Sequence, residues 1–225
     1  MADLLLLFPG QGSQKPGMAK DLAAAFPAAQ LTWDTVDEAL GVALSRIAFE
    51  GPADELTLTH NAQPALFTHG AAVWSVVREQ VAARVVAAAG HSLGEFTAFH
   101  AAGALGLADA ARLVRRRGEL MLESGAARPG AMAAILGDLN RPIDEICAEA
   151  SSAGVVVPAN YNAVEQTVIS GEVSGVEQAM ELAKAAGAKR AIRLNVSGAF
   201  HSPLMESATS GLESALQSAG WSDPL

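Results

Sequence analysis

Cysteine and charged residues are scarce in this chain, and each scarcity excludes a class of protein. Cys147 is the only cysteine among 225 residues, so neither an intrachain disulfide nor a thiolate metal cluster can form. Cys147 lies in the helical stretch 143–150, where we expect an inert buried thiol. Only 17% of the residues are charged and half are hydrophobic, which is enough apolar material for a substantial core.

Long apolar runs are absent as well. No stretch approaches the roughly 20 residues that span a membrane, and the opening run 4–8 is too short, and lacks the basic leader, for a signal peptide. Acidic residues outnumber basic ones by 24 to 15, for a net charge of −9, and a negative surface repels phosphate backbones. We therefore expect a soluble, cytoplasmic protein that binds neither membrane nor nucleic acid.

Strand and helix patterns alternate through the first half of the chain. The strand-like runs are 4–8 and 84–90, and the helical ones are 18–26, 31–40, 61–81 and 107–124. Asn61 can cap the third helix, with Pro64 in its first turn. The small and β-branched residues of 84–90 are typical of a buried parallel strand. This alternation predicts an α/β layered core.

A different order of elements begins after Arg128-Pro129-Gly130. The patterns are strand 132–136, helix 142–152, strands 155–160 and 167–170 around an Asn-rich turn, helix 173–186 and strand 190–196. The order β-α-β-β-α-β is that of the ferredoxin-like unit. The sequence therefore predicts an α/β core made of residues 1–127 and 197–225, with a ferredoxin-like α+β subdomain, residues 128–196, inserted into it.

Gly90-His91-Ser92-Leu93-Gly94 fits the pattern G-x-S-x-G between a predicted strand and a predicted helix. A serine at such a turn lies in strained backbone with its oxygen exposed, and the N-terminus of the next helix favours negative charge there. A glycine-rich connection without chemistry would share the pattern. The flanking strand and helix favour Ser92 as a nucleophile in an α/β-hydrolase-like core.

The general base must come from another histidine, because the side chain of His91 should point away from Ser92 in such a turn. We expect His60 in a polar loop and His69 and His100 within helices, where structural roles are more common. His201 lies in the turn between the last predicted strand and a helix that begins near Pro203. Catalytic groups are frequent in such loops, so His201 is the candidate base.

Two backbone N–H groups are candidate donors to an oxyanion. One belongs to Leu93, directly after the nucleophile, and the other comes from the turn Gly10-Gln11-Gly12 after the first strand. A tetrahedral intermediate needs such donors, each of which lowers the barrier by roughly 3 kcal/mol.

Arg117 falls on the apolar stripe of the helix 107–124. The apolar members of that stripe are Ala110, Leu113, Val114, Leu120 and Met121. A snorkelling arginine with its head group in water would fit this pattern. The alternative is a buried guanidinium, which requires a carboxylate partner. A substrate carboxylate could fill that role through two parallel hydrogen bonds, which indicates an acyl group that ends in a carboxylate.

Seven short stretches, spread along the whole chain, follow the order in which they occur in a known family. They are Phe8-Pro-Gly-Gln-Gly-Ser13, Gln63-Pro-Ala65, Gly90-His-Ser-Leu-Gly-Glu95, Arg117-Gly-Glu-Leu-Met121, Asn160-Tyr-Asn162, Val168-Ile-Ser-Gly171 and Gly198-Ala-Phe-His-Ser202. On these stretches the chain resembles the malonyl-CoA:acyl carrier protein transacylases of fatty-acid synthesis and, more broadly, the acyltransferase domains of polyketide synthases. The family has an α/β core with a ferredoxin-like insert.

The resemblance implies a role for each matching residue. Ser92 would be the nucleophile and His201 its partner, the backbones of Gln11 and Leu93 the oxyanion donors, and Arg117 the group that binds the malonyl carboxylate. Further substrate-binding positions would be Gln63, Met121, Asn162 and Phe200, the last in the form that selects malonyl groups.

The implied reaction is a ping-pong transfer of malonyl from malonyl-CoA to the phosphopantetheine thiol of an acyl carrier protein, with no metal or redox cofactor. We expect a monomer. Because carrier proteins are acidic, docking needs a basic patch. The candidates are Arg115, Arg116, Lys189, Arg190 and Arg193, for each of which a solvated surface position is the alternative.

The resembling family continues beyond the point at which this chain ends, Asp223-Pro224-Leu225. We therefore expect a truncated core with an exposed sheet edge and exposed apolar surface. Two other functions stay open. One is a serine hydrolase or thioesterase, which would want an acidic residue to orient His201 and gives Arg117 no role. The other is an inactive shortened acyltransferase that binds carrier protein or acts as a scaffold.

Overall fold

The computed structural model describes residues 2–224, which divide into two compact units. The first comprises Met1–Glu119 and Leu212–Leu225, and the second Leu120–Gly211. The second unit is longer at both ends than the predicted insert 128–196. The helix α7 (Leu107–Ala127) runs without interruption across the boundary at residue 120, and a continuous helical pattern gives no local sign of a change of unit.

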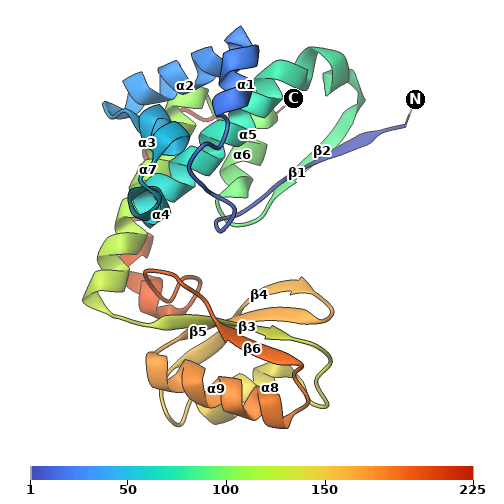
Figure 1. Ribbon diagram of the computed structural model, residues 1–225, viewed down its shortest axis with the longest axis vertical. Helices are drawn as coiled ribbons and strands as arrows, with labels where there is room; N and C mark the ends of the chain where they lie inside the picture. Colours follow the sequence, from blue (N-terminus) through green and yellow to red (C-terminus); the bar gives the residue numbers. More distant parts are fainter. Residues whose placement is uncertain (1, 225) are drawn as a thin grey trace. The chain divides into compact units, whose positions relative to one another are not determined.

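The first unit packs a small parallel sheet against a group of helices (Figure 1). Its elements before α7 are β1 (Leu4–Phe8), α1 (Lys20–Ala25), α2 (Pro27–Leu40), α3 (Leu44–Glu50), α4 (Ala53–Thr57), α5 (Thr59–Val81), a 3₁₀ turn (Ala82–Arg84), β2 (Val85–Gly90) and α6 (Gly94–Ala101). The predicted strands pair in parallel, from Leu4 against Val85 to Phe8 against Gly90. Trp33 and Phe67 are fully buried in the helical core.

The sheet of β1 and β2 is covered on one face only. Exposure alternates along β1, where Leu5 and Leu7 are 56% and 71% exposed while their neighbours are partly buried. Val86 of β2 is 67% exposed. The prediction that 84–90 is a buried strand is therefore wrong, because α6 packs against the two strands and still leaves Val86 exposed. The expected exposed apolar surface is present.

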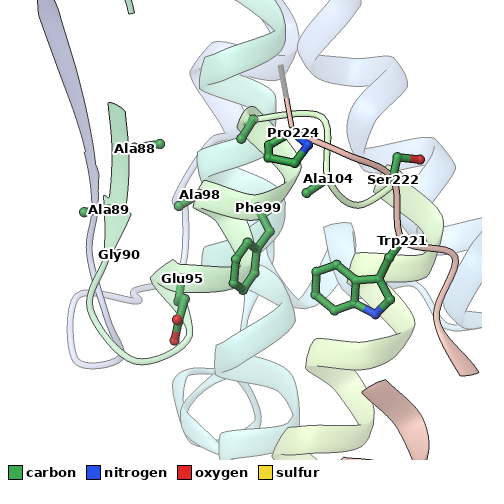
Figure 2. Close-up of a pocket in the computed structure, with 11 residues that line it drawn as sticks. Ala88, Ala89, Gly90, Glu95, Ala98, Phe99, Ala104, Trp221, Ser222 and Pro224 are labelled. Carbon is green, nitrogen blue, oxygen red and sulfur yellow. The ribbon is translucent and has the colours of Figure 1, made fainter. Parts of the chain in front are cut away.

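A hollow of about 650 Å³ lies beside β2 in the first unit (Figure 2). Ala88 and Gly90 line one side, and Phe99 and Trp221 line the other, with their rings edge to face at 5.3 Å. Trp221 is held there by an antiparallel bridge to Leu105. The end of the described chain thus packs against the loop between α6 and α7.

The second unit holds a four-stranded antiparallel sheet with two helices on one face (Figure 1). Its elements are β3 (Ala131–Leu136), α8 (Ile143–Ala150), β4 (Val156–Ala163), β5 (Gln166–Gly171), α9 (Val173–Ala185) and β6 (Arg190–Arg193), then a 3₁₀ helix (Pro203–Ala208) and the start of α10 (Thr209–Ser218). The spatial order β4-β5-β3-β6 is that of the ferredoxin-like unit. The predicted order of elements is confirmed.

Two details of the second unit bear on the sequence predictions. Cys147 is buried on α8, and burial, with a smaller effect of Asp144, raises the pKa of its thiol to about 12. The thiol is therefore inert, as predicted. The turn between β4 and β5 is at Val164 and Glu165, and Asn160 and Asn162 lie within β4, so the expected Asn-rich turn was misplaced.

None of the helices formed by residues 2–224 is long and apolar enough to cross a membrane.

Truncation of Ile169 tests the core of the second unit. Ile169 of β5 is fully buried, so Ile169→Ala should lower the free energy of unfolding by about 2–5 kcal/mol. Val164→Ala is the control, because that side chain is 99% exposed, and should change it by less than about 0.5 kcal/mol. Urea unfolding followed by circular dichroism measures both, and equal effects would contradict this description of the core.

Candidate active site

Ser92 lies in a sharp turn between β2 and α6. Its φ is 53°, in the left-handed region that residues with a side chain rarely adopt. A Cβ on Gly90 would lie 1.9 Å from the carbonyl carbon of Gly94, and a Cβ on Gly94 would lie 2.3 Å from the carbonyl oxygen of Phe8. A side chain at either position would clash with backbone atoms, so both positions require glycine. The strained turn expected from the sequence is present.

The side chain of His91 contacts the turn that follows β1. A Cβ on Gly10 would lie 2.4 Å from Nδ1 of His91, so the imidazole lies against the backbone of the turn after β1. The His91 N–H donates to the carbonyl oxygen of Phe8 at 3.0 Å. This agrees with the expectation that His91 packs beside the strand and that the base comes from elsewhere.

Arg117 is buried against Ser92. Its side chain belongs to a residue only 9% exposed, which excludes the snorkelling alternative. Nη2 donates to Oγ of Ser92 at 3.0 Å, Nη1 donates to Oε1 of Gln63, and the guanidinium carbon lies 5.8 Å from the ring centroid of Phe96. The partners of the cation are thus neutral oxygens and the face of a ring.

Burial lowers the pKa of Arg117 to about 10, an effect that the negative charge of Glu95 partly opposes. The guanidinium therefore stays charged at neutral pH. Among the ion pairs found between residues 2–224, none includes Arg117. A buried cation without a carboxylate partner gains most from an anionic ligand, and this one lies at hydrogen-bond distance from the candidate nucleophile.

A close contact between α7 and the start of α5 places Arg117. A Cβ on Gly118 would lie 2.6 Å from the Cα of His60, so only glycine allows the two backbones to approach this closely. Arg115 secures the same contact, because its Nη1 donates to the carbonyl oxygen of His60 at 3.0 Å. That carbonyl lacks a helical partner since Pro64, four residues later, has no N–H.

The start of α5 differs from the prediction. The helix begins at Thr59 with Leu58 in the N-cap position, and Asn61 does not cap it. Asn61 is buried, donates to the carbonyl oxygen of Glu55 at 2.9 Å and accepts from Arg115 at 2.7 Å. His60 accordingly lies in the first helical turn and not in a polar loop. Asn61 thus makes tertiary contacts instead of capping the helix.

The candidate oxyanion donors lie in the first unit with Ser92. Leu93 is 1% exposed and occupies the N-cap position of α6. Gln11 is partly buried in the turn after β1, where the N–H of Gly12 donates to Oε1 of Gln14 at 2.9 Å. The structure also shows a contact that the sequence did not suggest, because Thr59 joins the side chains of Gln63 and Gln11.

The second unit contains the other predicted site residues. His201 has a φ of 58°, also left-handed, and the hydroxyl of Ser202 donates to the carbonyl oxygen of Ala199 at 2.6 Å. Phe200 and Met121 are buried in one apolar cluster. Asn162 is exposed on β4. The structure thus brings Phe200 and Met121 together and leaves Asn162 outside their cluster.

The predicted basic patch is largely neutralised by acidic neighbours. Arg115 pairs with Glu119 at 2.9 Å. The further pairs are Arg116 with Glu119, Lys189 with Glu165 and Arg193 with Glu177. Within residues 2–224 no three His, Cys, Asp or Glu side chains come together in a way that could hold a metal ion.

Comparison with known proteins shows the family of this chain. The model of the acyl transferase domain family matches residues 5–223. The chain belongs to the acyl transferase family. Within this family it is 49% identical over 224 residues to the malonyl CoA-acyl carrier protein transacylase of Bacillus subtilis (strain 168), which covers 99% of this chain and 70% of that protein.

Solved acyl transferase structures have the same fold. The acyl-carrier-protein-S-malonyltransferase of Bartonella henselae superimposes with a TM-score of 0.94 at 46% identity, over 100% of this chain and 72% of that one. A malonyl-transacylase solved in complex with its type II PKS acyl-carrier protein superimposes with a TM-score of 0.93 at 41% identity, over 99% and 72%. The predicted α/β class and the predicted family are confirmed.

Substitution of Gly118 tests how this acyl transferase places Arg117. Gly118→Ala should push α5 and α7 apart and lower the free energy of unfolding by about 1–3 kcal/mol, the usual cost of overpacking. Gly106→Ala, at the start of the same helix, meets no atom within 4 Å and should cost less than about 1 kcal/mol. Urea unfolding measures the free energy of unfolding of both variants. An unchanged value for Gly118→Ala would contradict the close contact between α5 and α7.

Proposed function

We propose that this chain transfers a malonyl group from malonyl-CoA to the phosphopantetheine thiol of an acyl carrier protein through a malonyl-serine intermediate, as part of fatty-acid biosynthesis. The observation that carries the proposal is the hydrogen bond from buried Arg117 to Oγ of Ser92 at 3.0 Å. A cation at this place matches an acyl group that ends in a carboxylate. The names of the relatives and the related complex with an acyl-carrier protein support the same assignment.

In the first half of the reaction, Oγ of Ser92 attacks the thioester carbonyl carbon of malonyl-CoA. His201 accepts the serine proton, and the backbone N–H groups of Gln11 and Leu93 donate to the oxyanion. The carbon–sulfur bond then breaks, His201 returns the proton to the departing sulfur, and the malonyl group remains on Ser92 as an ester.

In the second half, the carrier thiol attacks the ester carbonyl carbon and Ser92 leaves. His201 takes the thiol proton and returns it to Oγ, which restores the free enzyme. Since each half exchanges one acyl bond for another and moves no net electrons, the proposed reaction needs no redox cofactor. We assign it no metal, because His201 moves the proton and the backbone N–H groups stabilise the oxyanion.

Arg117 supplies the selectivity in this scheme. Its present acceptors, Oγ of Ser92 and Oε1 of Gln63, are neutral, and a carboxylate is the stronger acceptor. We assign Gln63 to hold the guanidinium, and Phe200, Met121 and Asn162 to contact the acyl group or its carrier arm. Phe200 and Met121 offer apolar surface, and Asn162 an exposed amide.

The carrier protein and the setting belong to the same proposal. An acidic carrier would dock on exposed basic side chains, for which Arg190 and the ion-paired Arg116 are candidates. We place the reaction in the cytoplasm, with the chain acting as a monomer.

Acylation of Ser92 tests the proposed function directly. Incubation with malonyl-CoA should give a malonyl adduct that intact-mass spectrometry detects and that peptide mapping places on Ser92. Ser92→Ala should give none. Free malonate without a lasting adduct would favour a hydrolase, and neither adduct nor malonate at any malonyl-CoA concentration would favour an inactive scaffold.

Removal of the guanidinium should separate malonyl from acetyl transfer. Arg117→Ala deletes a charge-assisted contact to the malonyl carboxylate, so the kcat/KM for malonyl-CoA should fall about 10- to 100-fold further than that for acetyl-CoA, which has no carboxylate to lose. Arg112→Ala is the control on the same helix, because Arg112 is exposed and pairs only with Asp109 and a backbone carbonyl. Equal losses on both acyl groups in Arg117→Ala would make the arginine structural.

A further inference from the structure

A continuous set of side-chain hydrogen bonds joins Arg117 to the turn after β1. Nη1 of Arg117 donates to Oε1 of Gln63, and Nε2 of Gln63 donates to Oγ1 of Thr59 at 2.9 Å. The hydroxyl of Thr59 donates to Oε1 of Gln11 at 3.1 Å. All four residues belong to the first unit.

The direction of every bond in this series follows from Arg117. A guanidinium only donates, so the oxygen of the Gln63 amide must face it and the NH₂ group must face Thr59. The Thr59 hydroxyl then accepts from Gln63, and its single proton is left for Gln11. The carbonyl end of the Gln11 side chain is thereby turned toward Thr59.

Burial makes this series of hydrogen bonds, called the relay below, rigid. Thr59 and Gln63 are both fully buried, so their polar atoms cannot exchange these bonds for bulk water. A Cβ on Gly118 would lie 2.9 Å from the carbonyl oxygen of Thr59, which shows how closely α7 presses on this residue. Leaving a buried amide or hydroxyl without a partner is costly, so a displacement of one member shifts the next.

We propose that Thr59 is a positioning residue that couples the carboxylate-binding arginine to the oxyanion-binding turn. Thr59 touches neither substrate nor the reacting atoms in this scheme. Thr59 holds the side chain of Gln11, and with it the turn whose backbone N–H is the proposed second donor to the oxyanion. Binding of a carboxylate to Arg117 is thereby coupled to the correct placement of that donor. This inference rests on the proposed function.

The pair Thr59→Val and Thr59→Ser tests the proposal. Valine keeps the shape and loses the hydroxyl, whereas serine keeps the hydroxyl. In Thr59→Val the kcat for malonylation of Ser92 should fall about tenfold with a smaller change in KM, because a misplaced donor weakens transition-state contacts more than substrate binding. Thr59→Ser should stay within about threefold of the original chain. Thr59→Val at the original rate would overturn the proposal.

A second readout does not depend on activity. In ¹⁵N-labelled protein the side-chain amide signal of Gln11, assigned with Gln11→Leu, should shift in Thr59→Val and stay in place in Thr59→Ser. Gln63→Met breaks the relay one bond earlier and should cause the same shift, which keeps the test available if Thr59→Val folds poorly. An unmoved Gln11 signal in these variants would overturn the relay. Absence of malonylation in the unmodified chain would instead count against the proposed function, while the amide signal still decides the relay.

Discussion

The first unit depends on the burial of one positive charge. Arg117 is removed from water with only neutral oxygens and an aromatic face as partners, an arrangement that would be costly if any of these contacts were lost. The glycine at 118 and the contact of Arg115 with the unpaired carbonyl of His60 keep α7 and α5 close enough to satisfy it. Much of the polar arrangement around Ser92 follows from this requirement.

The turn at Ser92 imposes a second, purely local constraint. Ser92 keeps its left-handed backbone in a tight turn, in which the backbones of Gly90 and Gly94 lie against each other and Gly94 lies against the carbonyl of Phe8. The strain is therefore held by β1, β2 and the start of α6, within one unit. Glu95, next along α6, adds a negative charge that favours the charged form of Arg117. The strained serine and the buried cation are in this way parts of one structure.

The two units contribute different chemistry. The first carries Ser92, the Arg117 cation and the turn with Gln11, all connected by hydrogen bonds within the unit. The second carries His201 in left-handed backbone and the apolar cluster of Phe200 and Met121 on a ferredoxin-like sheet.

Patterns of short range in the sequence determined the strands β1 and β2, the length of α7 within a few residues, the ferredoxin-like order and the position of Arg117 on an apolar stripe. These features depend on neighbours two to four residues apart, which a single chain displays directly. Only the tertiary structure decided that α5 begins at Thr59, that β2 has an open face, that the units divide at residue 120, and that Thr59 connects Gln63 with Gln11. The partners in these contacts are about fifty positions apart in the chain, so they meet only after the helices have packed.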